Sequence, residues 1–154
     1  MAMAMFYHLT RSGSEATLLT LLPRALAAGW RVMIRGQDRA GLERLDAALW
    51  LNPEDGFLPH GLEGGPHDAD QPVLLGQGGA VNGAQALALI DGAEATVDEA
   101  RAMERVWTLF DGSDPVALAQ ARGLWTRLTQ AGVPAQYWSE ESGRWEKKAE
   151  RISG

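Results

Sequence analysis

The chain has 154 residues, of which 45% are hydrophobic, enough for one domain that buries its own core. It contains no cysteine, which excludes disulfides and thiolate zinc sites and is compatible with a reducing cytoplasm. The net charge of −6 is uneven, with a balance of −7 over residues 1–100 and +1 over residues 101–154. Because nucleic-acid binding depends on neutralising phosphates, most of the domain should repel nucleic acid, and only the last third suits an acidic partner.

The apolar start of the chain is short and lacks a basic leader and a cleavage site, so we expect no signal peptide. No apolar run approaches the roughly 20 residues that a membrane-spanning helix needs. We therefore expect a cytoplasmic protein that makes no contact with a membrane.

Alternating patterns and helix signals predict the first half of the fold. A strand is expected over residues 3–9, then a helix over residues 14–28 that starts at a capping box, Ser12 to Glu15, and stops at Gly29. A strand over residues 30–35 precedes a helix that Asp38 caps and that reaches Trp50. Leu42, Leu45, Ala48 and Leu49 form its buried stripe, and Pro53 marks its end.

The second half begins with a loop over residues 54–70, rich in glycine, proline and acidic residues. Strands are predicted over residues 72–76, 85–91, 104–111 and 136–139. The helix between the last two is the best marked, with Asp114 as N-cap, Pro115 at its first position and Gly132 at its end. From about residue 146 we expect a charged, frayed tail.

This alternation of strands and helices indicates an α/β fold. We expect a three-layer, Rossmann-like single domain over residues 1–154, with a mainly parallel sheet flanked by helices. The chain shows no internal repeat and no linker that would divide it.

One face of the helix after Asp114 combines an arginine with an aromatic ring. Arg122 lies at the edge of the apolar stripe, and Leu118 and Trp125 occupy the adjacent turns. A guanidinium beside a ring can bind a carboxylate while an apolar side chain packs on the ring. The residues alone favour the simpler alternative, a boundary arginine whose aliphatic stem covers core.

Trp50 and Phe57 flank the acidic loop, where little is available locally to bury them. They present a partner-binding patch if the rings face solvent, or fold back as core; the sequence weights the two equally.

Other patterns carry no site. His60, His67, Asp68 and Asp70 fit no zinc or calcium spacing, and the glycines at 76–79 lack the phosphate-loop and dinucleotide patterns. His8 is expected to be structural, and the basic residues after Arg144 to form a solvated surface. No serine lies in a nucleophile elbow, so we expect neither catalysis nor a cofactor or metal.

A set of short segments, in order along nearly the whole chain, resembles the chi subunit of bacterial DNA polymerase III. These segments lie at residues 6–9 (FYHL), 45–50 (LDAALW), 57–61 (FLPHG), 72–75 (PVLL), 110–112 (FDG), 121–125 (ARGLW), 137–138 (YW) and 143–148 (GRWEKK).

The resemblance implies an accessory subunit of the clamp-loader complex with no chemistry of its own. It implies two partners, the psi subunit and the acidic, phenylalanine-terminated tail of single-stranded DNA-binding protein, so that DNA is reached only indirectly. Arg122 and Trp125 match the family's tail site, and Phe110 falls in the same matching region. Leu118 stands where some members carry a basic residue, a departure that bears on tail affinity. Phe57 matches a phenylalanine that contacts psi, and Trp50 is its candidate neighbour.

Two alternatives stay open. One is a small Rossmann-like enzyme that uses the loop from Phe57 to Asp70, against which the missing phosphate fingerprint argues. The other is a direct binder of single-stranded nucleic acid that uses the C-terminal aromatic residues. The acidic balance of the chain argues against it.

Overall fold

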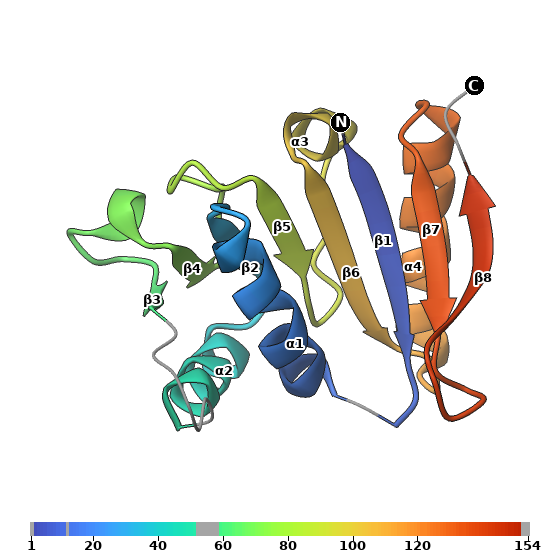
Figure 1. Ribbon diagram of the computed structural model, residues 1–154, viewed down its shortest axis with the longest axis horizontal. Coiled ribbons are helices and arrows are strands. Elements are labelled where there is room, and N and C mark those ends of the chain that lie inside the picture. The colour runs from blue at the N-terminus through green and yellow to red at the C-terminus, as the bar shows by residue number, and fades with distance from the viewer. Residues whose placement is uncertain (1, 12, 52–58, 152–154) are drawn as a thin grey trace.

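The computed structural model describes residues 2–11, 13–51 and 59–151, and its centre is one eight-stranded sheet. Along the sheet the strand order is β3-β4-β2-β5-β6-β1-β7-β8 (Figure 1). The strands are β1 (Met3–Leu9), β2 (Val32–Arg35), β3 (Gly61–Leu62), β4 (Val73–Gly76), β5 (Ala86–Leu89), β6 (Arg105–Asp111), β7 (Ala135–Ser139) and β8 (Glu146–Arg151).

Helices flank this sheet on both faces. They are α1 (Ser14–Ala27), α2 (Arg39–Leu51), α3 (Val97–Ala102) and α4 (Pro115–Gln130), with a 3-10 turn η1 (Asp68–Asp70). Helices α1 and α2 cover one face, and α3 and α4 cover the other (Figure 1). Their side chains join two separate core layers. The predicted α/β class is therefore confirmed.

The sheet is mixed, which corrects the expectation of a mainly parallel one. The described pairings from β3 across to β7 are parallel, whereas β7 and β8 pair antiparallel. Helical crossovers can join parallel neighbours, but the short turn from Ser139 to Glu146 returns the chain alongside β7 in the opposite direction.

The expectation of a frayed tail from about residue 146 is wrong, because this segment is β8. It pairs with β7 from Ser139↔Glu146 to Ala135↔Arg151. Its alternating charges suit an edge strand, where they discourage pairing with another chain. Lys147 forms an ion pair with Glu150 at 3.2 Å. This strand was not predicted because an exposed edge strand made of charged residues lacks the alternating apolar pattern on which strand prediction depends.

The N-caps predicted for α2 and α4 and the predicted end of α4 are confirmed. Asp38 accepts hydrogen bonds from the amides of Ala40 and Gly41, and Asp114 accepts from those of Val116 and Ala117. Gly132 follows α4 with φ at +85°, a conformation that glycine adopts without strain. The capping box predicted for α1 includes Ser12, which lies outside the described residues, and the N-cap of that helix is Gly13.

Two short elements were missed. Helix α3 has a complete capping box, in which Thr96 and Glu99 bond reciprocally, so its start was visible in the sequence. Strand β3, within the segment predicted as loop, pairs with β4 at Gly61↔Leu74 and Leu62↔Leu75. A two-residue strand is too short to show periodicity in the sequence. It forms because its backbone pairs with the neighbouring strand β4.

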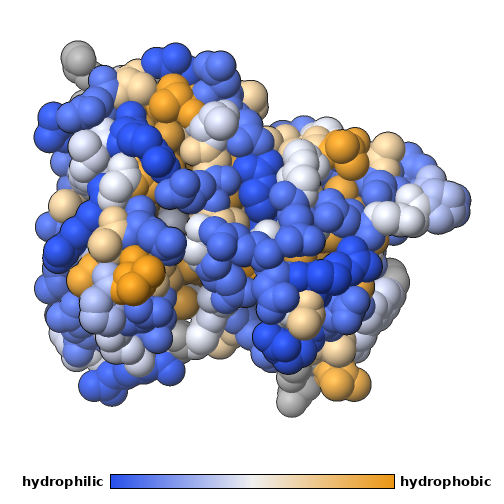
Figure 2. Space-filling model, turned by 180° about the vertical axis from the view of Figure 1, so that it is seen from behind, coloured by the Kyte–Doolittle hydropathy of each residue, from blue (hydrophilic) through white to orange (hydrophobic). Residues whose placement is uncertain are grey.

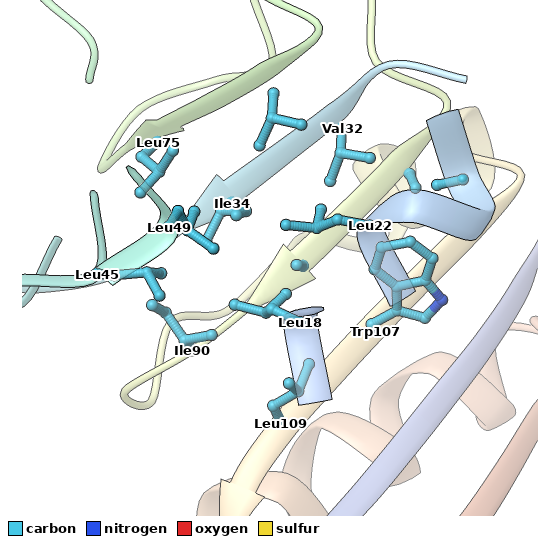
Figure 3. Packing of buried hydrophobic residues seen from close by; sticks show 14 of the residues in the cluster. Leu18, Leu22, Val32, Ile34, Leu45, Leu49, Leu75, Ile90, Trp107 and Leu109 are labelled. Carbon is cyan, nitrogen blue, oxygen red and sulfur yellow. The ribbon is translucent and has the colours of Figure 1, made fainter. Parts of the chain in front are cut away.

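The core consists of two apolar layers separated by the sheet. Figure 3 shows the layer beneath α1 and α2, where Leu18 and Leu22 pack over Val32, Ile34 and Trp107. Strands β2, β4 and β5 are buried at every position, as expected for parallel strands covered on both faces. Among the described residues, no helix is both long and apolar enough to span a membrane.

Candidate functional site

Five aromatic side chains meet where α4 covers β1, β6 and β7. The ring of Trp125 packs edge-on against Phe6 at 5.4 Å and Tyr137 at 6.1 Å between centroids. His8 lies 5.4 Å from Phe110 and 5.9 Å from Tyr137. We call these five residues the aromatic cluster.

Strand register explains why residues so far apart in sequence meet. Strand β1 lies between β6 and β7, so Phe6 pairs with Tyr137 and His8 pairs with Phe110. Side chains two residues apart on a strand share a face, and this face is the one that α4 covers. Trp125 then packs onto the rings from above, because it lies on the sheet-facing side of α4.

His8 connects the cluster to a carboxylate through both ring nitrogens. Its Nδ1 is 2.7 Å from the hydroxyl of Tyr137, and its Nε2 is 3.1 Å from Oε1 of Glu141. An ionised carboxylate can only accept, so Nε2 carries a proton that it donates to Glu141. In the neutral ring Nδ1 therefore accepts the hydrogen bond that Tyr137 donates.

Gly112 allows His8 to occupy this position. A Cβ atom added to Gly112 would lie 1.8 Å from Nε2 of His8, closer than any real contact. The Phe-Asp-Gly segment at the end of β6 thus supplies Phe110 to the cluster and leaves space for the imidazole.

Arg122 lies on the exposed surface of α4, beside this cluster. Within the described part of the chain, no hydrogen bond or ion pair holds its guanidinium, in contrast to Arg127 on the same helix, which pairs with Glu94 at 3.1 Å. Burial raises the pKa of the Tyr137 phenol above its ordinary value, while the nearby charge of Arg122 opposes this rise and that of Glu141 adds to it. Arg122 therefore offers an uncommitted cation next to a neutral phenol.

The predicted tail residues differ in accessibility. Trp125 and Leu118 are half-buried, so both keep surface for a partner, and Arg122 is exposed. Phe110 is only 6% exposed and supports the cluster from below rather than offering surface. We call the accessible group of Leu118, Arg122, Trp125 and Tyr137 the arginine–aromatic surface.

Sequence reasoning did not assign Tyr137, His8 or Glu141 to a site. The signal available was strand alternation, which places Phe6 and His8 on one face of their strand. Alternation cannot reveal which strands are neighbours, so the contacts with Tyr137 were not predictable.

Trp50, predicted at a second interface, lies at the end of α2 on a part of the sheet remote from α4 (Figure 1). Its side chain is 51% exposed, and its ring lies 4.3 Å from that of His60. His60 is buried, and its Nε2 is 3.2 Å from Oδ1 of Asp46. Phe57, the other residue of this prediction, lies outside the described residues.

The remaining loop patterns have local structural roles. Asp68 accepts hydrogen bonds from the amides of Gly64 and Gly65. The described ranges contain no group of three or more side chains that could hold a metal ion. In the glycine turn after β4, the amides of Gln77 and Gly78 donate to the carboxylate of Glu63, which occupies the place a phosphate would need.

Fold and site together define an α/β domain with an arginine–aromatic surface on one helix; the face that carries α4 is hydrophilic with small apolar groups (Figure 2). Comparison with known proteins specifies the class further. Residues 1–136 match the family described as DNA polymerase III chi subunit, HolC, and the chain belongs to this family.

DNA polymerase III subunit chi of Escherichia coli (strain K12) is similar to this chain, with 33% identity over 64 residues. This segment covers 42% of the chain and 44% of that protein, so it spans less than half of the relative's length. Family membership supports a role as a replication accessory subunit.

Proposed function

We propose that this protein is a non-enzymatic adaptor of the DNA polymerase III clamp-loader complex. Its arginine–aromatic surface binds the acidic, phenylalanine-terminated tail of single-stranded DNA-binding protein. The observation that carries this proposal is the exposed, uncommitted guanidinium of Arg122 beside the half-buried rings of Trp125 and Tyr137. Contact with DNA is then indirect, through the coated template.

The chemistry of the surface suits such a tail. The planar fork of Arg122 can hold a carboxylate with two parallel hydrogen bonds. Trp125 and Leu118 supply apolar area one turn away on either side of Arg122, where a terminal phenyl ring can pack edge-on to the indole. We expect micromolar affinity, about −8 kcal/mol, that weakens as salt screens the charges.

A second surface around Trp50 and Phe57 is proposed to bind the psi subunit. The exposed ring of Trp50 is followed by Leu51, whose side chain is 82% exposed. Large exposed apolar side chains next to one another are typical of protein interfaces. Since α2 and α4 contact opposite faces of the sheet, both partners could bind at once (Figure 1).

The test is a titration with a fluorescent peptide that matches the tail of the organism's own single-stranded DNA-binding protein. The control peptide lacks the final phenylalanine. We expect saturable binding that is lost with the control peptide. Loss of a hydrogen-bonded charge costs about 1.5–3 kcal/mol, so R122A should weaken binding roughly tenfold to a hundredfold.

R127A is the matched control, because Arg127 lies on the same helix but is paired with Glu94. Equal affinity of R122A and the parent protein, with both folded, would refute the tail site. Tight binding of a bare oligonucleotide without any protein partner would instead support direct recognition of single-stranded nucleic acid.

A further inference from the structure

A pocket of about 570 Å³ opens at the carboxyl ends of β1, β5 and β6. It lies between the N-termini of α1 and α4. Strand β1 continues into α1 on one face of the sheet, whereas β6 continues into α4 on the other, and open α/β sheets bind ligands at such divergence points. The volume is in the range of small-molecule sites. Neither Arg122 nor Trp125 lines it, so it is separate from the arginine–aromatic surface.

The charges of the pocket exclude the usual ligand of this position. Every ionisable residue that lines it is acidic: Asp91, Glu94, Asp111 and Asp114. Arg127 neutralises Glu94 at 3.1 Å. Each of the two helix N-termini contributes about half a positive charge, which three remaining carboxylates outweigh. A phosphate would therefore be repelled and a cation attracted.

These carboxylates still have unused acceptor atoms. Asp111 accepts from Ser113 through Oδ1, and Asp114 accepts from the first turn of α4 through Oδ1. Over residues 2–11, 13–51 and 59–151, Oδ2 of each has no hydrogen-bond partner, and the side chain of Asp91 has none at all. Each of the three residues therefore keeps a free oxygen that can accept from an incoming N–H donor.

Independent evidence for a ligand comes from Thr108 on β6. This residue lines the pocket and is only 6% exposed, yet its hydroxyl has no hydrogen-bond partner. Val106 and Phe110, two residues away on either side, belong to the core beneath α4, so Thr108 points to the same side. There the pocket is lined by Ala121 and Leu124 of α4. Buried hydroxyls are normally paired, and this one belongs to a residue that lines the pocket and has no partner among the described residues.

We propose that the pocket binds an organic cation that carries an alkylammonium group and a second polar group joined by an aliphatic chain. The ammonium lies among Asp91, Asp111 and Asp114, and the second group bonds to Thr108. Thr108 and Asp111 are three residues apart on β6, so their Cα atoms lie roughly 10 Å apart along the strand, and this sets the span of the ligand. A free amine and a lysine side chain of a protein share this chemistry.

The first experiment is an NMR titration of the full-length, ¹⁵N-labelled protein with aminohexanol, which has both groups at about the right separation. Hexanediol controls for the charge, and hexylamine controls for the hydroxyl. We expect saturable shifts at the amides of Gly92, Thr108 and Ser113 with aminohexanol and none with hexanediol. Shifts that fail to saturate in the millimolar range, or that spread over the whole surface, would overturn the proposal.

Variants separate the two ends of the ligand. D91N, D111N and D114N combined remove three charges but keep the amide oxygens that accept the local hydrogen bonds, so the fold is retained. This variant should bind aminohexanol at least about tenfold more weakly. Unchanged affinity would refute the ammonium site.

The matched control for charge combines E43Q, D70N and D98N, three exposed acids outside the pocket, and should bind like the parent protein. T108V, which keeps the shape of the side chain, should weaken aminohexanol severalfold and leave hexylamine unchanged. An equal effect on both amines would refute the hydroxyl contact. A short lysine-containing peptide that binds more tightly than aminohexanol would identify a protein as the source of the amine, and the reverse order a free amine.

Discussion

The hydroxyl of Tyr137 lies 2.7 Å from Nδ1 of His8, although the two residues are 129 positions apart in the chain. This contact joins the first strand to the last strand of the parallel array and lies under the ring of Trp125. It links a buried residue, His8, to Tyr137 of the arginine–aromatic surface, which we propose binds a peptide tail. The position of Tyr137 in that surface is therefore stabilised by a buried imidazole.

Removing the hydroxyl of Tyr137 should show how much its contact with His8 contributes to stability. In Y137F, Nδ1 of His8 loses its donor while remaining buried, and an unsatisfied buried acceptor costs about 1–3 kcal/mol. We expect urea denaturation to report a loss in the free energy of unfolding of that order. Y7F is the control, because among the described residues no hydrogen bond is shown for Tyr7. Equal stability of Y137F and the parent protein would mean that the His8 contact contributes nothing.

Two glycine substitutions should have opposite effects. In G112A the new methyl group would overlap the imidazole of His8, which must leave both Tyr137 and Glu141, so we expect destabilisation and altered imidazole nitrogen shifts in NMR spectra. In G123A, on exposed α4, the methyl group meets nothing within 4 Å. Alanine there should stabilise the protein by roughly 0.5–1 kcal/mol, because glycine is unfavourable within helices. A G112A protein as stable as its parent would show that His8 tolerates displacement.

Acid should weaken the link between β2 and α3. The guanidinium of Arg35 donates to Glu99 at 3.1 Å from Nη1, with a second bond from Nη2, and this lowers the pKa of Glu99 from its ordinary 4.5 to about 2. A depressed carboxyl pKa stabilises the fold above pH 4.5, and this stabilisation is lost as the pH falls from 4.5 toward 2. E99Q should therefore be less stable than the parent protein at pH 7, with the difference vanishing near pH 2.

E43Q is the comparison for this measurement, since Glu43 forms an exposed pair with Arg39 at 3.4 Å and should change the pH profile little. Parallel unfolding curves for E99Q and the parent protein across this pH range would argue against the Arg35 contact as the cause.

A lysine at position 118 should strengthen tail binding. Leu118 lies one turn before Arg122 on the same face of α4. An added exposed charge contributes about 0.2–1 kcal/mol, so L118K should bind the tail peptide up to roughly fivefold more tightly at low salt. The gain should disappear in high salt as the charge is screened.

A119K adds the same charge at an exposed position of α4 that is not part of the arginine–aromatic surface, and any smaller gain there measures general attraction. If L118K bound the peptide no better than A119K, the tail would not pass position 118.

The sequence by itself determined the elements whose signals are local. The two ends of α4 were predicted from Asp114, Pro115 and Gly132, and the α/β class was predicted from the pattern of strands and helices. Both predictions succeeded because capping and periodicity depend on neighbours within a few residues. The ordered family segments were likewise readable from the chain alone, and so was the pairing of Arg122 with Trp125 on one helix face. Family membership is confirmed by the match over residues 1–136.

Only the tertiary structure decided which strands are neighbours, and the site depends on that choice. Strand β1 lies between two strands whose paired residues follow it by more than a hundred positions in the chain, and this register places His8 against Tyr137 and Phe110. Pairing with β7 makes the charged tail strand β8, and the order of the strands places Thr108 on the lining of a pocket whose ionisable residues are all acidic. No local pattern encodes these relationships, because hydrogen bonds between strands join residues whose separation in sequence is arbitrary.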